Sequence, residues 1–241
     1  MKFLIEKIAG EVRHDFSITL LESLRFRKWL SFDTDDTVVK YINCNANDNI
    51  WFFKDFHKNY VPIGSVEFVI SWFKRFYGHV LKPINVPDEL FDYGERGIFN
   101  GPHYDIFDLI DKRFVKSNDH IKGFTEIIDR KYKLPKGNYQ FSEVIDIESE
   151  WRAFVYQGKL VGLQNYSGDF TMFPDVERIK TMIDAYNSAP IAYTLDVGVF
   201  NEKTFVIECH PMISVGLYGF SNHKLLPYMF YRAFKEIINN L

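Results

Sequence analysis

The sequence predicts an α+β protein, because strand-like segments are grouped along the chain around segments with helical periodicity. Between residues 113 and 166 the pattern is mostly that of strands. Apolar stripes typical of helices lie before this block at 65–77 and after it at 175–186 and 224–240. With 46% hydrophobic and 17% aromatic residues, the chain can bury a sizeable core.

The composition excludes several classes of protein. A net charge of -3 argues against a nucleic-acid binder, which usually carries a basic field. No run of about 18 apolar residues is present, so no membrane span is predicted. Only a short apolar stretch precedes Glu6 and Lys7, so we expect no signal peptide and a cytoplasmic protein. Cys44 and Cys209 form no disulfide framework or zinc pattern, and Cys209 is expected to be a small buried hydrophobe.

The first hundred residues are predicted to hold short strands and three helices. Ser65 can cap a helix that Gly78 ends. Gly, Pro and Asn are frequent in residues 97–103, so we predict a division near residue 100 between segments 1–100 and 101–241. The predicted strands are Lys2–Ile8, Val38–Ile42, Ile50–Phe53 and Val80–Lys82; the predicted helices are Phe16–Leu30, Ser65–Tyr77 and the short Asp88–Tyr93.

The next block predicts strands and one clear hairpin. Its turn is Gln157–Gly158, and symmetric pairing about that turn places Arg152 opposite Leu163 and Glu150 opposite Asn165. Glu150 and Arg152 then share one face of their strand, as residues two apart must. The predicted strands are Arg113–Lys116, Gly123–Ile128, Tyr139–Ile145, Glu150–Tyr156 and Lys159–Tyr166.

A second hairpin, within residues 192–218, carries the strongest chemical signal. If its loop is Asn201-Glu202-Lys203, Asp196 lies directly opposite Glu208, and Thr194 lies opposite His210. Like charges directly opposite one another destabilise a sheet, so a bound cation is expected, and oxygen-rich sites select magnesium or manganese. The alternative is an exposed strand face on which both carboxylates point into water.

Strand alternation also assigns faces in this hairpin. Val206 is predicted to share a face with Glu208 and His210, while Ile207 and Cys209 occupy the other face.

Three basic residues are candidates for binding an anion. Lys116 and Lys122 flank a polar loop and could close over a polyphosphate as point charges; the alternative is two solvated surface lysines. Arg152 lies in mid-strand, where it needs a phosphate or acidic partner; the alternative is an ion pair with a carboxylate on a neighbouring strand. There is no P-loop motif, so a Walker-type nucleotide site is excluded.

These residues occur in one order that resembles the ATP-grasp fold, and most closely its clade named for an arginine and two lysines. The likeness covers about residues 50 to 220 and rests on Lys116, Lys122, Ser142-Glu143-Val144, Glu150-Trp151-Arg152, Asp196 and Ile207-Glu208-Cys209-His210. The resemblance implies two α+β lobes gripping ATP in residues 101–241, preceded by a small N-terminal α/β region in residues 1–100.

The resemblance also implies roles for residues. Lys116 and Lys122 would bind the ATP phosphates, and Arg152 would face the γ-phosphate or an acyl-phosphate. Two departures from the family are His210, where asparagine is common, and Ser117, where proline is common. An imidazole at residue 210 would either orient the substrate instead of binding the metal or make manganese more acceptable. Ser142, Glu143, Val144 and Glu150 would bind the nucleotide, the first three as a hinge for adenine, while Asp196, Glu208 and His210 would bind the metal.

The implied activity is ATP-dependent ligation of a small-molecule or peptide carboxylate to an amine through an acyl-phosphate. Tyr218 and the loop Ser214–Gly219 are substrate contacts by position alone. One alternative is a non-catalytic nucleotide-binding or protein-interaction module on the same fold. Another is a metal-dependent hydrolase that uses Asp196, Glu208 and His210 without ATP.

Overall fold

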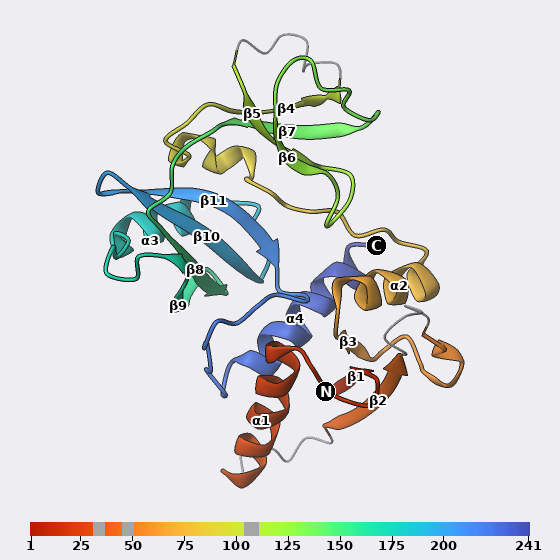
Figure 1. Cartoon of the computed structure of the whole chain (residues 1–241). Helices are drawn as coiled ribbons and strands as arrows, with labels where there is room; N and C mark the ends of the chain where they lie inside the picture. Colours follow the sequence, from red (N-terminus) through yellow and green to blue (C-terminus); the bar gives the residue numbers. More distant parts are fainter. Residues whose placement is uncertain (31–36, 45–50, 104–110) are drawn as a thin grey trace. The chain divides into compact units, whose positions relative to one another are not determined.

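A computed structural model describes residues 1–30, 37–44, 51–103 and 111–241 (Figure 1). Contacts divide the chain into two compact units. The predicted division at residue 100 does not coincide with them, because it falls inside strand β4 (Ile98–Pro102). Unit 1 is Met1–Val80, Pro190–Ala192 and Met212–Leu241, and unit 2 is Leu81–Ala189 and Tyr193–Pro211.

Unit 1 contains a parallel three-stranded sheet in the order β2-β1-β3. Its C-terminal helix α4 packs against α1 and β3. The strand and helix predictions for residues 2–8, 38–42 and 16–30 are confirmed. The elements are β1 (Lys2–Ile8), α1 (Asp15–Trp29), β2 (Val38–Cys44), the 3-10 helix η1 (Phe53–Asp55), β3 (Val61–Ile63), α2 (Val66–Tyr77) and α4 (Leu226–Asn239). No described helix combines the length and the apolar character needed to cross a bilayer.

The strand predicted for Ile50–Phe53 is wrong over its described part. Ile50 lies outside the described residues, and Phe53 begins η1. The ring of Phe53 instead packs 5.8 Å from Phe68 and 5.2 Å from Trp72 of α2, measured between centroids. This aromatic packing overrides the strand propensity of the segment.

The buried carboxylate of Glu6 ties β1 to the start of α2. It accepts hydrogen bonds from Trp51 Nε1 (2.9 Å), the Ser65 amide (2.6 Å) and the Ser65 hydroxyl (3.1 Å). Burial raises the pKa of Glu6, but the hydrogen bonds from His14, Ser65 and Trp51 together lower it below its ordinary value. The Ser65 hydroxyl also caps α2 as predicted, accepting from the Phe68 amide.

Unit 2 contains two four-stranded sheets, ordered β11-β10-β8-β9 and β4-β7-β5-β6. Helix α3 packs on the first sheet, and residues such as Ile179, Met182 and Leu195 fill the core between them. The elements are η2 (Asp88–Tyr93), β5 (Arg113–Ser117), β6 (Thr125–Ile128), β7 (Asn138–Glu143), β8 (Ser149–Tyr156), β9 (Lys159–Gly168), α3 (Val176–Ala185), β10 (Ala192–Phe200) and β11 (Lys203–Pro211).

Two segments near the start of unit 2 differ from prediction. The strand expected at Val80–Lys82 is absent, because the chain passes from one unit to the other there and Val80 is exposed. Strand β4 was not expected from its glycine and proline content. It lies at the edge of its sheet, where a proline such as Pro102 is tolerated although it has no amide hydrogen to donate to a neighbouring strand.

The predicted register of β8 and β9 is wrong. Arg152 lies opposite Gln164, and Glu150 lies opposite Ser167, one and two residues beyond the predicted partners. Two bulges, each adding a residue on β9, cause the shift. Tyr166 is one of the added residues, and its hydroxyl donates to Glu150 Oε2 at 2.8 Å.

In the β10–β11 hairpin the predicted register at the acidic residues is confirmed, although the predicted turn is wrong. The turn is Asn201-Glu202, with both residues left-handed at φ 47° and 60°, as a two-residue hairpin turn requires. A bulge next to Asp196 adds one residue on β11 and offsets the shorter turn. Asp196 therefore pairs with Glu208, and Thr194 pairs with His210.

The bulge also changes which side chains share a face of β11. Val206 is buried in the same core cluster as Cys209, so its predicted place beside Glu208 is wrong. Ile207, the added residue, lines a cavity together with Glu208. The predicted burial of Cys209 is confirmed.

Candidate functional site

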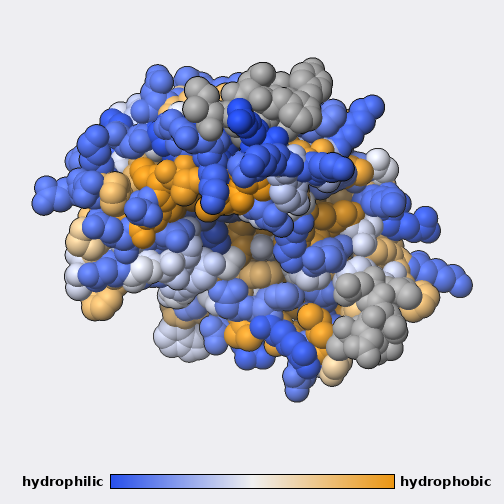
Figure 2. Space-filling model, turned by 45° about the horizontal axis from the view of Figure 1, so that its top comes forward, coloured by the Kyte–Doolittle hydropathy of each residue, from blue (hydrophilic) through white to orange (hydrophobic). Residues whose placement is uncertain are grey.

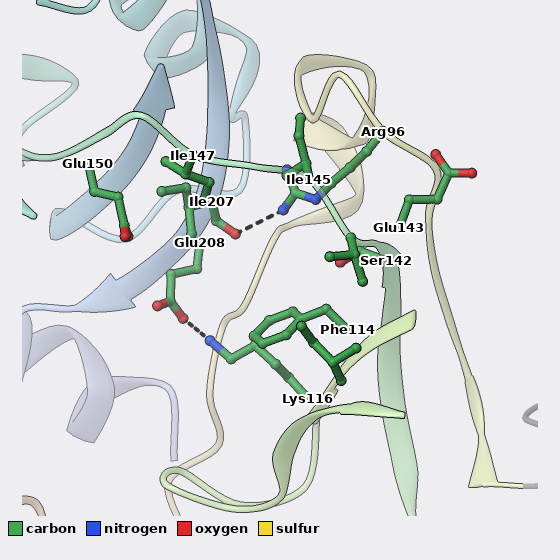
Figure 3. Close-up of a pocket in the computed structure, with 12 residues that line it drawn as sticks. Arg96, Phe114, Lys116, Ser142, Glu143, Ile145, Ile147, Glu150, Ile207 and Glu208 are labelled. Carbon is green, nitrogen blue, oxygen red and sulfur yellow. Dashed lines mark hydrogen bonds and ion pairs between the residues drawn. The ribbon is translucent and has the colours of Figure 1, made fainter. Parts of the chain in front are cut away.

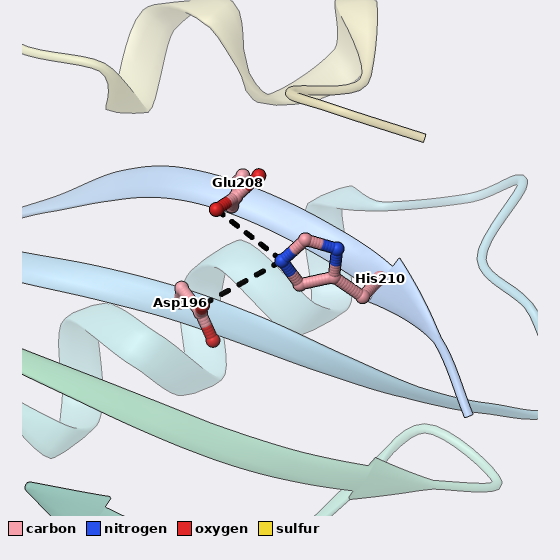
Figure 4. Close-up of side chains that lie close together, drawn as sticks. All are labelled: Asp196, Glu208 and His210. Carbon is pink, nitrogen blue, oxygen red and sulfur yellow. Dashed lines mark ion pairs between the residues drawn. The ribbon is translucent and has the colours of Figure 1, made fainter. Parts of the chain in front are cut away.

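Asp196, Glu208 and His210 point toward one another from adjacent strands (Figure 4). Each offers one ligand atom, and these atoms lie within 4.8 Å of one another. His210 Nε2 is 3.3 Å from Glu208 Oε1 and 3.7 Å from Asp196 Oδ2. The pairing of β10 with β11 thus brings together the three residues predicted to bind a metal.

Arg152 reaches the same cluster from β8, the other neighbour of β10. Its guanidinium donates twice to Asp196, from Nε to Oδ1 at 2.8 Å and from Nη2 to Oδ2 at 2.6 Å. Both side chains are buried, at 9% and 1% exposure. This contact is the alternative considered for Arg152, an ion pair with a carboxylate on a neighbouring strand.

Tyr166 and Glu150 extend this polar network along the sheet. The Arg152 guanidinium lies 5.6 Å from the centroid of the Tyr166 ring. Burial, reinforced by the negative charges of Asp196 and Glu150, raises the pKa of Tyr166 far above its ordinary value. Tyr166 is therefore a neutral donor to Glu150.

Lys116 of β5 forms an ion pair with Glu208 from the facing sheet of unit 2 (Figure 3). Burial raises the pKa of Glu208, but the hydrogen bond and charge of His210 and the charge of Lys116 outweigh it and lower the pKa far below its ordinary value. Glu208 is therefore ionised at neutral pH.

A cavity of about 250 Å³ opens between the two sheets of unit 2 beside this ion pair (Figure 3). Two apolar residues of its lining, Ile127 and Val144, are 54% and 47% exposed. Figure 2 shows apolar and hydrophilic residues side by side on one face of the protein. A slot of this kind suits a planar apolar group that carries charge at one end. The lining is Phe114, Ile127, Val144, Ile145, Ile147 and Ile207, with Arg96, Lys116, Ser142, Glu143, Glu150 and Glu208.

The acidic cluster fits a divalent cation. The two carboxylates suit magnesium or manganese, and the softer imidazole makes manganese more acceptable. The buried Thr194 hydroxyl, two residues before Asp196 on the same strand face, has no hydrogen-bond partner among the described residues. An unsatisfied buried hydroxyl beside the cluster is consistent with a further ligand there.

The predicted hinge residues Ser142, Glu143 and Val144 line the cavity at the end of β7. Glu143 is held by two hydrogen bonds with Gly97: its amide donates to the Gly97 carbonyl at 3.0 Å, and its carboxylate accepts from the Gly97 amide at 2.8 Å. Lys122 is not brought to this lining in the described structure. It is exposed in the loop between β5 and β6, with φ 54°.

Arg96 belongs to the cavity lining and was missed by the sequence analysis. Its guanidinium donates to the carbonyls of Gly94 at 2.9 Å and Val206 at 2.8 Å, and lies 3.5 Å from that of Ile207. Burial lowers the pKa of Arg96 to about 10, so it stays charged at neutral pH. No sequence pattern could have identified it, because the carbonyls that tie it to β11, those of Val206 and Ile207, lie more than a hundred residues away along the chain.

A model of the ATP-grasp domain, R2K clade family 2, matches residues 93–227, more than half of the chain. The chain belongs to this family. The resemblance to this ATP-grasp clade and the predicted ATP-grasp fold are therefore confirmed.

Solved structures agree with the ATP-grasp assignment, at identities that show the fold alone. D-alanine–D-alanine ligase from Bacillus anthracis is 9% identical over 100% of this chain and 99% of that chain, with a TM-score of 0.51. N5-carboxyaminoimidazole synthetase from Staphylococcus aureus is 12% identical over 96% and 78%, at 0.56. A RimK domain ATP-grasp protein from Sphaerobacter thermophilus is 11% identical over 97% and 98%, at 0.51. No curated protein matches this ATP-grasp chain.

Proposed function

We propose that this protein is an ATP-dependent ligase that joins a carboxylate to an amine. The observation that carries the proposal is the meeting of Lys116 and Glu208 at the cavity, directly beside Asp196 and His210. A lysine that could bind phosphate and a set of carboxylates that could bind a metal thus lie beside a cavity that could take the adenine ring. The names of structural relatives, such as D-alanine–D-alanine ligase, agree with this class of reaction.

ATP is the expected nucleotide of the cavity. Apolar residues such as Phe114 and Ile207 would contact the adenine, and the backbone of Ser142–Val144 would hydrogen-bond its edge. Glu150, which also lines the cavity, would take part in binding the nucleotide. Lys116 would bind the phosphates as a point charge, and Lys122 would join it from the β5–β6 loop.

Asp196, Glu208 and His210 would hold the magnesium, with manganese as a second choice. When bound, the metal supplies charge neutralisation at the phosphates. Arg152 would stabilise negative charge at the γ-phosphate or acyl-phosphate, while its paired contact with Asp196 keeps that carboxylate in place.

The chemistry needs no covalent enzyme nucleophile. A carboxylate oxygen of the acid attacks the γ-phosphorus of ATP, and ADP leaves, giving an acyl-phosphate. The amine nitrogen then attacks the acyl carbon, inorganic phosphate leaves, and the amine loses a proton. The protein contributes position and charge, which dominate catalysis of phosphoryl transfer.

Thermal-shift titrations with ATP test this function on wild type and on Lys116→Ala, each with and without magnesium. A bound ligand raises the melting temperature by linkage. We expect a magnesium-dependent rise in wild type that Lys116→Ala loses, and then release of ADP with some pair of acid and amine. No shift at millimolar ATP would contradict the proposal. A shift without turnover across a broad screen would instead support a non-catalytic nucleotide-binding module.

A further inference from the structure

Asn85 is bonded to the immediate chain neighbours of both Lys116 and Glu208. Its carbonyl accepts from the amide of Cys209, next to Glu208 on β11, at 2.7 Å. Its side-chain Nδ2 donates to the carbonyl of Ser117, next to Lys116 on β5, at 3.0 Å. One buried residue, 3% exposed, therefore joins the two strands that carry the ion pair at the cavity.

The position of Asn85 is itself fixed by further contacts. Its Nδ2 also donates to Asn118 Oδ1 at 2.7 Å. The next residue, Val86, exchanges two hydrogen bonds with the side chain of Gln140 on β7, at 3.0 and 2.8 Å. Asn85 is thus held against the β4-β7-β5-β6 sheet while it bonds to β11.

Strand β11 lies at the edge of its own sheet, so its outer backbone groups need partners from outside that sheet. Asn85 supplies one at Cys209, and Arg96 supplies another at Val206. These two contacts stand on either side of Glu208 along the strand. The segment between α2 and β4 therefore holds the backbone that carries this carboxylate (Figure 1).

We propose that Asn85 is a positioning residue that keeps Lys116 and Glu208 in register, so that the phosphate-binding ammonium and the metal-binding carboxylate act on one ligand. The role rests on the proposed function. Two groups that must engage one ligand lose affinity when their separation is not fixed beforehand. Asparagine suits the position because it tolerates the left-handed φ of 55° and supplies the amide donors.

The variant Asn85→Gly isolates the side chain. Glycine adopts a positive φ without strain, so the backbone and the carbonyl bonded to Cys209 are retained while the amide is lost. Asn201→Gly is the matched control, since Asn201 is also left-handed, at φ 47°, but lies exposed in the β10–β11 turn. If Asn85→Gly fails to fold, Asn85→Asp keeps the shape and removes the donors.

The measurement is the dissociation constant of ATP with and without magnesium, by calorimetry, on the full chain. The ratio of the two constants reports the coupling between metal and nucleotide. We expect Asn85→Gly to reduce this coupling by about tenfold while the affinity for ATP without magnesium stays the same, and Asn201→Gly to retain the wild-type coupling. A merely structural role predicts a lower melting temperature with the coupling retained, or a parallel loss of both affinities.

Retained coupling or parallel losses would overturn the role of Asn85 and leave the proposed function intact. If wild type shows no magnesium-dependent binding of ATP, the proposed function fails as well, so the two failures are distinguishable.

Discussion

On the proposed function, Lys116 and a divalent cation would compete for the Glu208 carboxylate, so removing the Lys116 charge should change the binding of metal and the binding of ATP in opposite directions. The Lys116 ammonium is paired with Glu208, and the two side chains are only 19% and 18% exposed. In the absence of nucleotide, a metal that binds Glu208 as proposed would have to displace this ammonium. Removing the ammonium should therefore tighten the binding of metal alone, although the same ammonium should favour the binding of ATP.

The magnitude follows from the strength of the contact. A hydrogen bond to a charged group contributes about 1.5–3 kcal/mol, and each 1.4 kcal/mol is about a tenfold change in affinity. The substitution Lys116→Met keeps most of the length of the side chain and removes its charge. We expect it to tighten the binding of Mn²⁺ without nucleotide by about ten- to a hundredfold, and to weaken the binding of ATP.

Calorimetric titration with Mn²⁺, and separately with ATP and magnesium, measures both effects. The matched control is Lys159→Met, which removes the same charge from an exposed lysine at the start of β9. That control should leave both affinities close to wild type. Unchanged or weaker Mn²⁺ binding by Lys116→Met would refute the reasoning, because the ion pair would then not compete with a metal.

Three further substitutions test buried charges and close packing. Glu6→Gln should lower the free energy of unfolding at pH 7 by about 1–3 kcal/mol. The pKa of Glu6 is lowered in the folded state, so its contribution to stability is present above its unfolded-state pKa of about 4.3 and is lost as pH falls through its folded-state pKa. In urea unfolding, the difference in stability between wild type and Glu6→Gln should therefore shrink by pH 3. Asp196→Asn should lower the free energy of unfolding by about 3–5 kcal/mol, because it removes the charge of the buried partner of Arg152. Adding Arg152→Met should recover part of this loss in a double-mutant cycle, and additive losses of stability would contradict the prediction. Gly198→Ala should lower stability by about 1–3 kcal/mol in thermal unfolding, since a Cβ would lie 2.6 Å from the Phe205 ring; an unchanged melting temperature would show that the ring moves aside.

The acidic pair was predictable because two local departures from the ideal hairpin offset each other. Side-chain alternation locates strands and their faces but does not reveal a bulge. The turn is one residue shorter than expected, and the bulge beside Asp196 restores the register at Glu208. The same bulge reversed the face of Val206, which pattern alone could not anticipate.

The second hairpin shows the same limit without the compensation. Both bulges there add residues to β9, so the error in register grows from Arg152 to Glu150. The network through Tyr166 consequently could not be foreseen from the alternation of polar and apolar residues. Its hydroxyl reaches Glu150 from a bulged position.

The roles of Asn85 and Arg96 could not be predicted from the sequence, for a different reason. Their partners are backbone groups of Ser117, Cys209 and Val206, far away along the chain. A backbone amide or carbonyl is present at nearly every residue, so it leaves no signature in side-chain composition. Lys122 is the converse case, because its place in a familiar order of residues predicted a role that its exposed loop position does not itself establish.

The path of the chain through unit 1 has a consequence for folding. Helix α4 (Leu226–Asn239) packs against α1 and β3, which are made more than 140 residues earlier. On the ribosome, the parallel sheet β2-β1-β3 therefore emerges long before the helix that helps to bury it. Unit 2 can complete nearly all of its contacts first, since it uses residues 81–211 with only a three-residue interruption. Closing so long a loop carries an entropic cost, so the N-terminal sheet should be the last part of the protein to gain protection against hydrogen exchange.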